Sequence, residues 1–279
     1  MATRTVKRNA KTSLANDEKR GFYVSDCVKF MQGMRPCTVD LTVTSPPYDN
    51  LRNYDGYKFD FEAIADQLYR ITKPNGIVVW VVGDKITGGR TLTSFKQGLY
   101  FRDIGFNMHD VMIYQKKNTP FMRSNAYTNC YEFMFVLCKG KPAVFNPIKQ
   151  KTIRSGEEMV VYNKKADGIN RKTKATLNKE KTKTNIWQYA VGLGGTTTDR
   201  EAFLHPAVFP EKLAYDHILS WTNKNALVFD PMCGSGTTGK MAKLLDRQFL
   251  CIDISKAYID IAKKRIKRYE HDLAMSSLL

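Results

Sequence analysis

The sequence has no hydrophobic run long enough to cross a bilayer and no pair of cysteines at metal-binding spacing. The longest aliphatic run covers residues 77–82, whereas a membrane-spanning helix needs about 20 apolar residues. The basic amino terminus lacks the apolar stretch of a signal peptide. The six cysteines are scattered and include no C-x-x-C, which is typical of buried thiols in a reducing compartment. These absences predict a cytoplasmic protein that makes no membrane contact and holds no metal ion.

Acidic residues are also scarce. The 279 residues include 44 Lys and Arg against 27 Asp and Glu, which gives a net charge of +17. This balance favours a polyanionic partner, above all nucleic acid, over the alternative of a merely soluble basic protein. Residues 139–183 concentrate the excess, with 13 basic and four acidic residues. From charge alone this segment is either a solvated surface loop or an insert that binds phosphates.

Two kinds of apolar segment alternate along the chain from residue 21 onward. Continuous apolar runs predict strands, and apolar residues spaced by three and four predict helices. Strands are expected at 22–25, 39–44, 77–82, 111–114, 133–138, 226–230 and 249–253, and helices at 59–72, 91–104, 211–221, 237–245 and 257–269. Pro74-Asn75-Gly76 is expected to end the first of these helices. The alternation predicts an α/β fold with a doubly wound, mostly parallel sheet.

A glycine loop between a strand and a helix marks a candidate cofactor site. Gly234, Gly236 and Gly239 match G-x-G-x-x-G, and Asp253 follows Gly234 by 19 residues, at the end of the next strand. Such a loop lets the backbone approach a ligand, and the acid can bind ribose hydroxyls, so we expect an adenosine-containing cofactor rather than a turn without a ligand. Only about 40 residues follow Gly239, too few for the second half of an NAD site, and no Gly-Lys-Thr/Ser completes a P-loop. S-adenosylmethionine, with one adenosine and no pyrophosphate, fits better.

A second loop, Ser45-Pro46-Pro47-Tyr48, directly follows the apolar segment 39–44. In open α/β sheets the carboxyl ends of the strands carry the site. The two prolines stiffen the loop and leave the Pro46 carbonyl free as an acceptor, while Ser45 supplies a hydroxyl and Tyr48 a flat ring. Two acceptors and a stacking ring suit a planar substrate with an exocyclic amino group.

The two loops together resemble the defining motifs of the amino-group DNA methyltransferases, the N4-cytosine and N6-adenine class. That family carries a D/N/S-P-P-Y/F/W loop and a D-P-F-x-G-S-G-T loop, and this chain has Met232 in place of the family's Phe. The catalytic loop comes first, as in the family's β group. The resemblance implies a circularly permuted, Rossmann-like fold of S-adenosylmethionine-dependent methyltransferases with an inserted basic DNA-recognition region.

Weaker matches extend the resemblance over most of the chain. Residues 24–27 resemble the family's G-D-C, whose Asp approaches the cofactor's adenine, and residues 205–210 resemble the stretch that closes over its methionine end. The cofactor site implied by the resemblance consists of Asp26, Thr44, His205, Pro206, Phe209, Asp230, Pro231, Cys233, Gly234, Ser235, Gly236, Thr237 and Asp253. The chain divides into a basic mobile arm (1–20), a catalytic half (21–140), a basic insert for target recognition (141–183) and a cofactor-binding half (184–279). The candidate DNA contacts are Arg52, Arg123, Arg154, Arg171 and Lys172.

The activity that the resemblance implies is methyl transfer to the exocyclic amino group of a base that has left the duplex. Tyr48 would stack on this base, while Ser45 and the Pro46 carbonyl would accept hydrogen bonds from its amino group. Serine before Pro-Pro is more usual in N4-cytosine enzymes, so cytosine is preferred and adenine N6 is the alternative. An RNA or protein-glutamine methyltransferase is a second alternative, disfavoured because its usual motif order is the reverse.

Double-stranded DNA is the implied partner, and the implied source is a bacterium or a phage. A second copy of the chain and a restriction endonuclease stay open as further partners. Sequence specificity depends on side chains that reach base edges, and the sequence does not indicate which residues of the insert do so.

Overall fold

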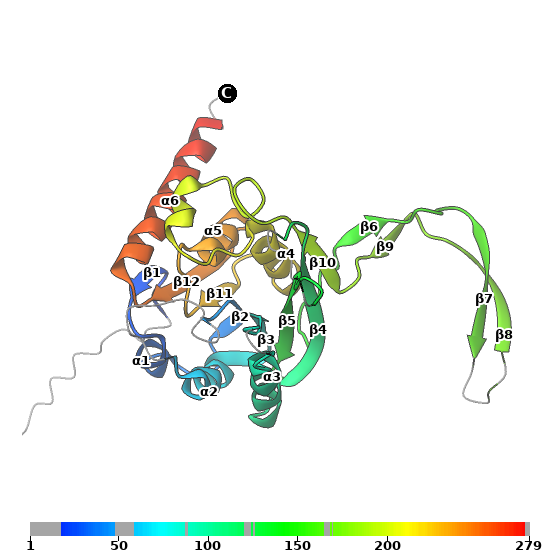
Figure 1. The fold of residues 1–279 in the computed structure, drawn as a ribbon, viewed down its shortest axis with the longest axis horizontal. Helices are drawn as coiled ribbons and strands as arrows, with labels where there is room; N and C mark the ends of the chain where they lie inside the picture. The colour runs from blue at the N-terminus through cyan, green and yellow to red at the C-terminus, as the bar shows by residue number, and fades with distance from the viewer. Residues whose placement is uncertain are drawn as a thin grey trace, which may run out of the picture.

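The computed structural model describes residues 18–47, 59–86, 89–119, 126–164 and 170–276, together with residues 124 and 168. Within them, eight strands form one sheet in the order β1-β12-β11-β2-β3-β5-β4-β10 (Figure 1). In that order the strands are β1 (Gly21–Val24), β12 (Gln248–Asp253), β11 (Leu227–Asp230), β2 (Val39–Thr44), β3 (Thr72–Val82), β5 (Tyr131–Cys138), β4 (Asn107–Lys116) and β10 (Ile186–Tyr189). The first five are parallel, β5 is antiparallel to both its neighbours, and β10 is parallel to β4. The predicted doubly wound, mostly parallel sheet is confirmed.

Helices cover both faces of this sheet. They are α1 (Cys27–Gln32), α2 (Phe61–Ile71), α3 (Thr93–Asp103), α4 (Glu211–Trp221), α5 (Thr237–Leu244) and α6 (Lys256–Ser276). Apolar side chains of α1, α2 and α3 form one core with one face of the sheet, and those of α4 and α5 form another with the opposite face. The side chains of residues 77–82 in β3 are all buried, as the continuous apolar run requires of a strand covered on both sides.

The start of β3 differs from the prediction. Helix α2 ends at Ile71, and β3 begins at the next residue, so Pro74-Asn75-Gly76 lies within the strand and does not end the helix. Thr72 already has extended backbone angles (φ −67°, ψ 131°) and pairs with Val39 of β2. Pairing with a neighbouring strand, which a local pattern does not report, therefore ends the helix earlier than the proline does.

Helix α1, with six residues, was not predicted, and neither were two shorter elements. Strand β10 has only four residues and alternates exposed with buried side chains at the edge of the sheet. A short 3₁₀ helix, η2 (Arg200–Leu204), precedes α4. Both are too short to show a period in the sequence.

The basic segment 139–183 contains regular structure. Strands β6 (Lys149–Lys151) and β9 (Glu180–Thr182) form one two-stranded sheet, and β7 (Glu158–Lys164) and β8 (Asn170–Thr176) form another. The part of this segment from β6 to β9 (residues 149–182), called the arm from here on, projects away from the main sheet beyond β10 (Figure 1). No helix among the described residues is long and apolar enough to cross a membrane.

Candidate functional site

The glycine loop begins where β11 ends and leads into α5. The backbone N–H of Cys233 donates to the Ile252 carbonyl of β12, with N and O 2.8 Å apart. Gly234 and Gly236 have positive φ, +49° and +80°, a region that favours glycine. A Cβ on Gly234 would lie 2.6 Å from Nε2 of His205, and one on Gly236 would lie 2.5 Å from the Ala262 Cβ. The close packing against α6 and His205 therefore needs both glycines.

Asp253 stands at the carboxyl end of β12, beside this loop. One carboxylate oxygen accepts a hydrogen bond from the Gly234 N–H and the other from the Ser255 N–H, each at 2.9 Å. Burial raises the pKa of this carboxyl, although the backbone donors act in the opposite direction. Asp253, the acid expected to bind ribose, thus also holds the glycine loop in place through its hydrogen bond with Gly234.

Asp230 links the two predicted loops. Its Oδ1 accepts hydrogen bonds from the Thr44 hydroxyl at 2.8 Å and from the Met232 N–H at 3.1 Å. Thr44 is the last residue of β2, directly before Ser45, so the two loops meet on adjacent parallel strands. Burial raises the pKa of Asp230 to about 7, against the lowering effect of these two hydrogen bonds and of the nearby Thr238 hydroxyl. Its Oδ2 is buried and has no hydrogen-bond partner among the described residues.

The start of the Pro-Pro loop lies at this junction. Ser45 and Pro47 are half-buried, and Pro46 is buried. Tyr48, the predicted stacking ring, lies outside the described residues, as do the predicted DNA contacts Arg52 and Arg123.

Asp26 lies at the same edge of the sheet. It caps α1, because its Oδ1 accepts from the Lys29 N–H at 2.8 Å. The preceding residue, Ser25, donates its N–H to the Asp253 carbonyl at 3.0 Å. The carboxyl ends of β1, β12, β11 and β2 thus bring Asp26, Asp253, the glycine loop and Ser45 together.

The segment before α4 contributes His205, whose buried ring packs edge-on against Tyr258 of α6 with 4.3 Å between ring centroids. Its Nδ1 accepts from the Ala207 N–H at 3.1 Å. Pro206 is exposed, and Phe209 packs against the core beneath α4 and α5. His205 thus lies directly beside Gly234 of the glycine loop.

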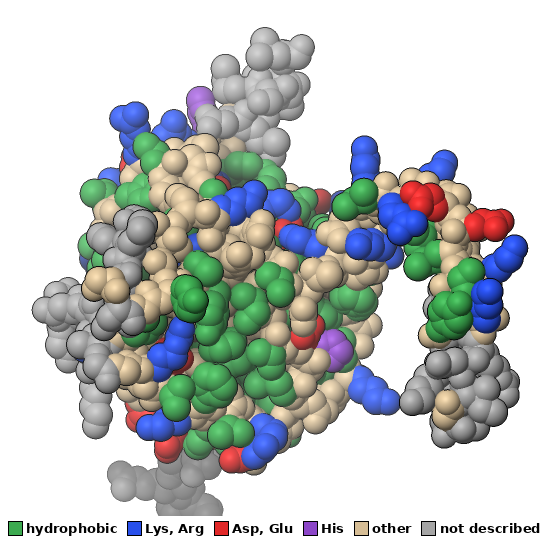
Figure 2. Space-filling model, turned by 45° about the vertical axis from the view of Figure 1, so that its right-hand side comes forward, with side chains coloured by type: hydrophobic (Ala, Val, Ile, Leu, Met, Phe, Trp, Pro, Cys, Tyr) green, Lys and Arg blue, Asp and Glu red, His purple; other side chains and the backbone are tan. Residues whose placement is uncertain are grey.

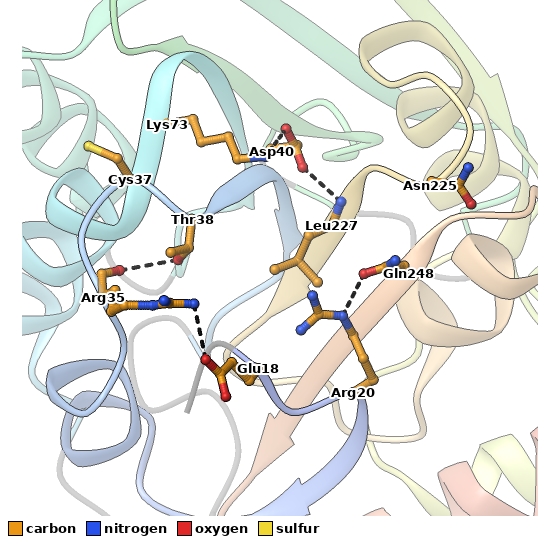
Figure 3. A pocket seen from close by; sticks show the side chains of 10 residues that line it. All are labelled: Glu18, Arg20, Arg35, Cys37, Thr38, Asp40, Lys73, Asn225, Leu227 and Gln248. Atoms are coloured by element: carbon orange, nitrogen blue, oxygen red, sulfur yellow. Dashed lines mark hydrogen bonds and ion pairs between the residues drawn. The ribbon is translucent and has the colours of Figure 1, made fainter. Parts of the chain in front are cut away.

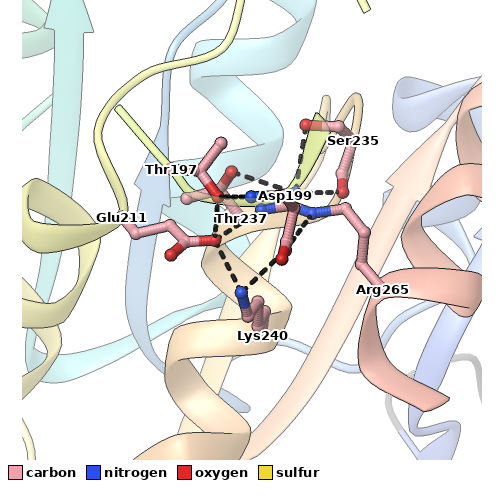
Figure 4. Close-up of polar contacts among 7 residues, drawn as sticks. All are labelled: Thr197, Asp199, Glu211, Ser235, Thr237, Lys240 and Arg265. Atoms are coloured by element: carbon pink, nitrogen blue, oxygen red, sulfur yellow. Dashed lines mark hydrogen bonds and ion pairs between the residues drawn. The ribbon is translucent and has the colours of Figure 1, made fainter. Parts of the chain in front are cut away.

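Sequence reasoning missed a buried network of charges behind the glycine loop (Figure 4). Arg265 donates to Asp199 at 3.0 Å and to Glu211 at 2.6 Å, and Lys240 donates to the same two acids at 2.7 and 2.8 Å. Burial acts to raise the pKa of Asp199, but the hydrogen bonds from Lys240 and Arg265 lower it below its ordinary value. The Arg265 side chain is only 1% exposed. We call these four residues the ion network.

The ion network holds the glycine loop through Arg265. Its guanidinium also donates to the Ser235 carbonyl at 2.5 Å and to the hydroxyls of Ser235 and Thr237 at 3.2 and 3.3 Å. Both hydroxyls, predicted as cofactor contacts, therefore accept from Arg265. The available signal was positional: Arg265 falls in the buried stripe of α6 formed by Ile259, Ala262 and Ile266, where an unpaired charge would be costly.

The remaining predicted DNA contacts lie in the arm. Arg154, in the bend between its two sheets, pairs with Glu157 at 2.7 Å. Arg171 and Lys172 are in β8, and the Lys172 side chain is exposed. All three are on the projecting arm, away from the junction of the two loops (Figure 1).

A shallow pocket of about 300 Å³ lies at the opposite edge of the sheet, at the amino ends of β2, β11 and β12 (Figure 3). Its charged side chains are paired: Asp40 accepts from Lys73 at 2.7 Å, and Arg35 lies 3.4 Å from Glu18. Because the two loops lie at the carboxyl ends of these strands, this pocket is separate from them. Within the described residues, no group of three or more His, Cys, Asp or Glu is placed to hold a metal ion.

The parallel sheet and the two loops on its adjacent strands define the class: a methyltransferase that acts on amino groups of DNA bases. A family model described as DNA methylase, of the N6 and N4 type, matches residues 39–264. The orphan methyltransferase M.BamHII of Bacillus amyloliquefaciens is 51% identical over 239 residues, which cover 84% of this chain and 90% of the relative. The type II methyltransferase M.HinfI of Haemophilus influenzae is 25% identical over an alignment of 292 positions, which covers 94% of this chain and 73% of the relative.

Solved structures share the fold. The PvuII DNA methyltransferase, described as cytosine-N4-specific, aligns with a TM-score of 0.62 and 17% identity over 88% of this chain and 86% of that one. M1.HpyAVI in complex with S-adenosylmethionine aligns with a TM-score of 0.58 and 23% identity over 88% of this chain and 98% of that one.

The chain therefore belongs to the N6/N4 DNA methylase family and is an S-adenosylmethionine-dependent DNA methyltransferase. The predicted family and fold class are confirmed. The predicted cofactor is S-adenosylmethionine, and a solved structure with the same fold binds it.

Proposed function

We propose that the protein methylates the N4 amino group of cytosine at specific sites in double-stranded DNA, using S-adenosylmethionine bound at the glycine loop. The observation that carries this proposal is the hydrogen bond between Thr44 and Asp230, 2.8 Å long. It fixes the Ser45-Pro46-Pro47 loop beside the glycine loop, so that a base and a methyl donor would meet at one point of the sheet edge.

The residues present fit the cofactor. The buried Oδ2 of Asp230, without a partner among the described residues, would accept a hydrogen bond from the cofactor's ammonium group. Asp26 and Asp253, at the ends of neighbouring parallel strands, would face its adenine and ribose. His205, which lies against Gly234, would complete the wall beside the glycine loop together with Pro206 and Pro231. Phe209 and Cys233 pack into apolar clusters of the core and would support the site from behind. When bound, the cofactor supplies a methyl group on a sulfonium.

The Pro-Pro loop would orient the base. The Ser45 hydroxyl and the Pro46 carbonyl would accept hydrogen bonds from the exocyclic amino group, which aims the nitrogen lone pair at the methyl carbon. Tyr48 would stack on the ring and replace part of the stacking that the base loses when it leaves the duplex. Catalysis would then come mainly from positioning, since the displacement is direct.

Cytosine is preferred over adenine because serine precedes Pro-Pro. The PvuII methyltransferase, which shares the fold, is described as cytosine-N4-specific, so the fold accommodates this chemistry. N6 of adenine is the competing target, since it too is an amino group beside a ring nitrogen.

The basic arm would bind the DNA. Arg154, Arg171 and Lys172 in the arm, with Arg52 and Arg123, are the proposed contacts. The relative M.BamHII is named an orphan methyltransferase, which favours activity without an endonuclease partner.

Nucleoside mass spectrometry tests the proposal. The protein is incubated with unmethylated DNA and S-adenosylmethionine that carries a deuterated methyl group, and the DNA is digested to nucleosides. We expect labelled N4-methylcytosine. Labelled N6-methyladenine would overturn the choice of base, and no labelled nucleoside, with cofactor binding intact, would overturn DNA as the substrate.

The variant Ser45→Ala tests the role of the loop. We expect turnover to fall up to about 100-fold, as when a reacting atom is misplaced, while cofactor affinity is unchanged. Thr38→Ala is the matched control, since it removes a hydroxyl that donates to the Arg35 carbonyl just before the amino end of the same strand. Equal turnover in the two variants would remove Ser45 from the mechanism.

A further inference from the structure

The arm is fixed firmly where it leaves the main sheet. The Asn146 side chain donates to the carbonyls of Leu219 and Thr222 at the end of α4, at 3.0 and 3.1 Å. Phe145 stacks on Trp221, with 5.1 Å between ring centroids and 29° between ring planes. The returning strand runs into β10, which pairs with β4. The arm therefore starts from a defined position on the core.

Beyond this root, the two small sheets are one ribbon with a bend. The Thr152 N–H donates to the Lys179 carbonyl at 2.9 Å, and the Leu177 N–H donates to the Glu157 carbonyl at 3.1 Å. Gly156, with φ +83°, lies at the bend. These bonds continue the hydrogen-bond ladder from the β6–β9 sheet to the β7–β8 sheet. The two sheets therefore form one continuous ribbon, with β7 and β8 at its end.

None of the described side chains of the distal ribbon belongs to a buried apolar cluster. On one face, Tyr162 lies opposite Lys172 and Val160 opposite Lys174, and Glu158 precedes them on the same side of β7. Tyr162 is 65% exposed, Val160 39%, and the Lys174 side chain 81%. A two-stranded hairpin alone is marginally stable in water. Contact with a binding partner would therefore stabilise this exposed ribbon more than its own packing does.

Charge identifies the partner. Residues 139–183 carry 13 basic and four acidic residues, and Lys and Arg side chains lie along the arm (Figure 2). Dimensions agree with the same partner. The seven residues of β7 span about 23 Å at about 3.3 Å per residue, which is roughly seven base-pair steps. The major groove of B-DNA, about 12 Å wide, admits a two-stranded ribbon.

We propose that the β7–β8 ribbon lies in the major groove beside the target base and reads sequence with the face that carries Tyr162, Lys172 and Lys174. This inference rests on the proposed action on double-stranded DNA and adds which element determines specificity. In the protein alone the Lys174 ammonium lies 3.9 Å from a Glu158 carboxylate oxygen. On DNA this exposed pair would separate, so that the lysine ammonium groups donate to guanine O6 and N7 and the Glu158 carboxylate accepts from cytosine N4. Val160 would contact a thymine methyl group.

The test maps methylated sites in a pool of DNA with randomised sequence. The full-length protein is compared with the double variant Lys172→Ala/Lys174→Ala and with Tyr162→Ala. We expect both variants to keep the cofactor affinity of the unchanged protein, because the ribbon lies away from the two loops. We expect the ratio of methylation at preferred sites to that at sites with one altered base pair to fall about 10-fold or more, the effect of losing one good base contact.

The matched control is Lys264→Ala/Lys267→Ala, which removes two exposed lysines from α6 and so changes the net charge equally. It should leave the ratio unchanged. An unchanged ratio in the ribbon variants would overturn the proposal, whether their activity is intact or uniformly reduced, because uniform loss indicates phosphate contacts alone. Failure of the proposed function is distinct, because in that case the unchanged protein itself would methylate no DNA.

Discussion

Asp230 is buried where the two loops meet, and its charge depends on pH near neutrality. Burial raises the pKa of its carboxyl to about 7, although the hydrogen bonds from Thr44 and the Met232 N–H and the nearby Thr238 hydroxyl favour the charged form. Without a partner for Oδ2 among the described residues, the protein alone holds a proton that the unfolded chain would release. Asp230 should therefore make the unfolding free energy of the cofactor-free protein depend on pH.

The sign of that dependence follows from the two pKa values. An unfolded Asp titrates near 3.9, so the stabilising proton uptake at Asp230 is fully present below about pH 4 and is lost as the pH rises through about 7. We expect the unfolding free energy of the unchanged protein, minus that of Asp230→Asn, to fall by roughly 3 kcal/mol between pH 4 and pH 8. Urea denaturation across this range measures it. A difference that stays constant with pH would show that Asp230 is charged throughout.

The ion network acts at the level of helices. Arg265 on α6 and Lys240 on α5 bind the same two acids, Asp199 before η2 and Glu211 at the start of α4. Two positive and two negative charges balance, so the burial of each is compensated by the others. The network therefore joins four segments behind the glycine loop, and Arg265 adds the direct bond to the Ser235 carbonyl.

Arg265→Met should remove this support. We expect a loss of about 3–5 kcal/mol of unfolding free energy, since the two half-buried acids would lose one of the two cations that they share and keep Lys240. We also expect weaker binding of S-adenosylmethionine, measured by calorimetry, because the Ser235 carbonyl loses its donor. Arg268→Met, at an exposed position of the same helix, is the control and should cost less than about 0.5 kcal/mol. Similar losses in both variants would refute the buried role of Arg265.

Local patterns predicted the bounds of an element well where its apolar residues follow the period of that element. The strand 39–44 and the helix 211–221 have the predicted bounds, because their apolar residues repeat with the period of the element. The ribbon strands β6 to β9 left no such pattern, since they bury little and pair only with each other. The early start of β3 was missed because it depends on pairing with β2, which the local sequence does not encode.

The same reasoning applies to the site. Gly234, Asp230 and Ser45 could be located because each motif is a short segment with its own chemistry. The ion network could not, since its members come from four separate elements that only the fold brings together. The roles of Ser235 and Thr237 differ for the same reason: their hydroxyls face a partner that lies 28 or more residues further along the chain.

Across the entire chain, a net charge of +17 should make DNA binding strongly dependent on salt. If about six phosphates are neutralised, affinity should fall about 1,000-fold between 50 and 200 mM salt. Fluorescence anisotropy with a labelled duplex measures this slope. Binding of S-adenosylmethionine, followed under the same conditions, should change little and serves as the control. A shallow slope would mean that the basic arm makes few phosphate contacts.

The hydrogen bond between Thr44 and Asp230 joins residues 186 positions apart, and this has a consequence for synthesis of the protein. At about 5–20 residues per second, a ribosome needs roughly 10–40 s to add that stretch. During this time β2 has no neighbour on the side where β11 will pair, and its free edge can attract other strands. A nascent chain released before β11 would carry the Pro-Pro loop without the glycine loop. Abortive translation products should therefore be inactive and prone to aggregate through this edge.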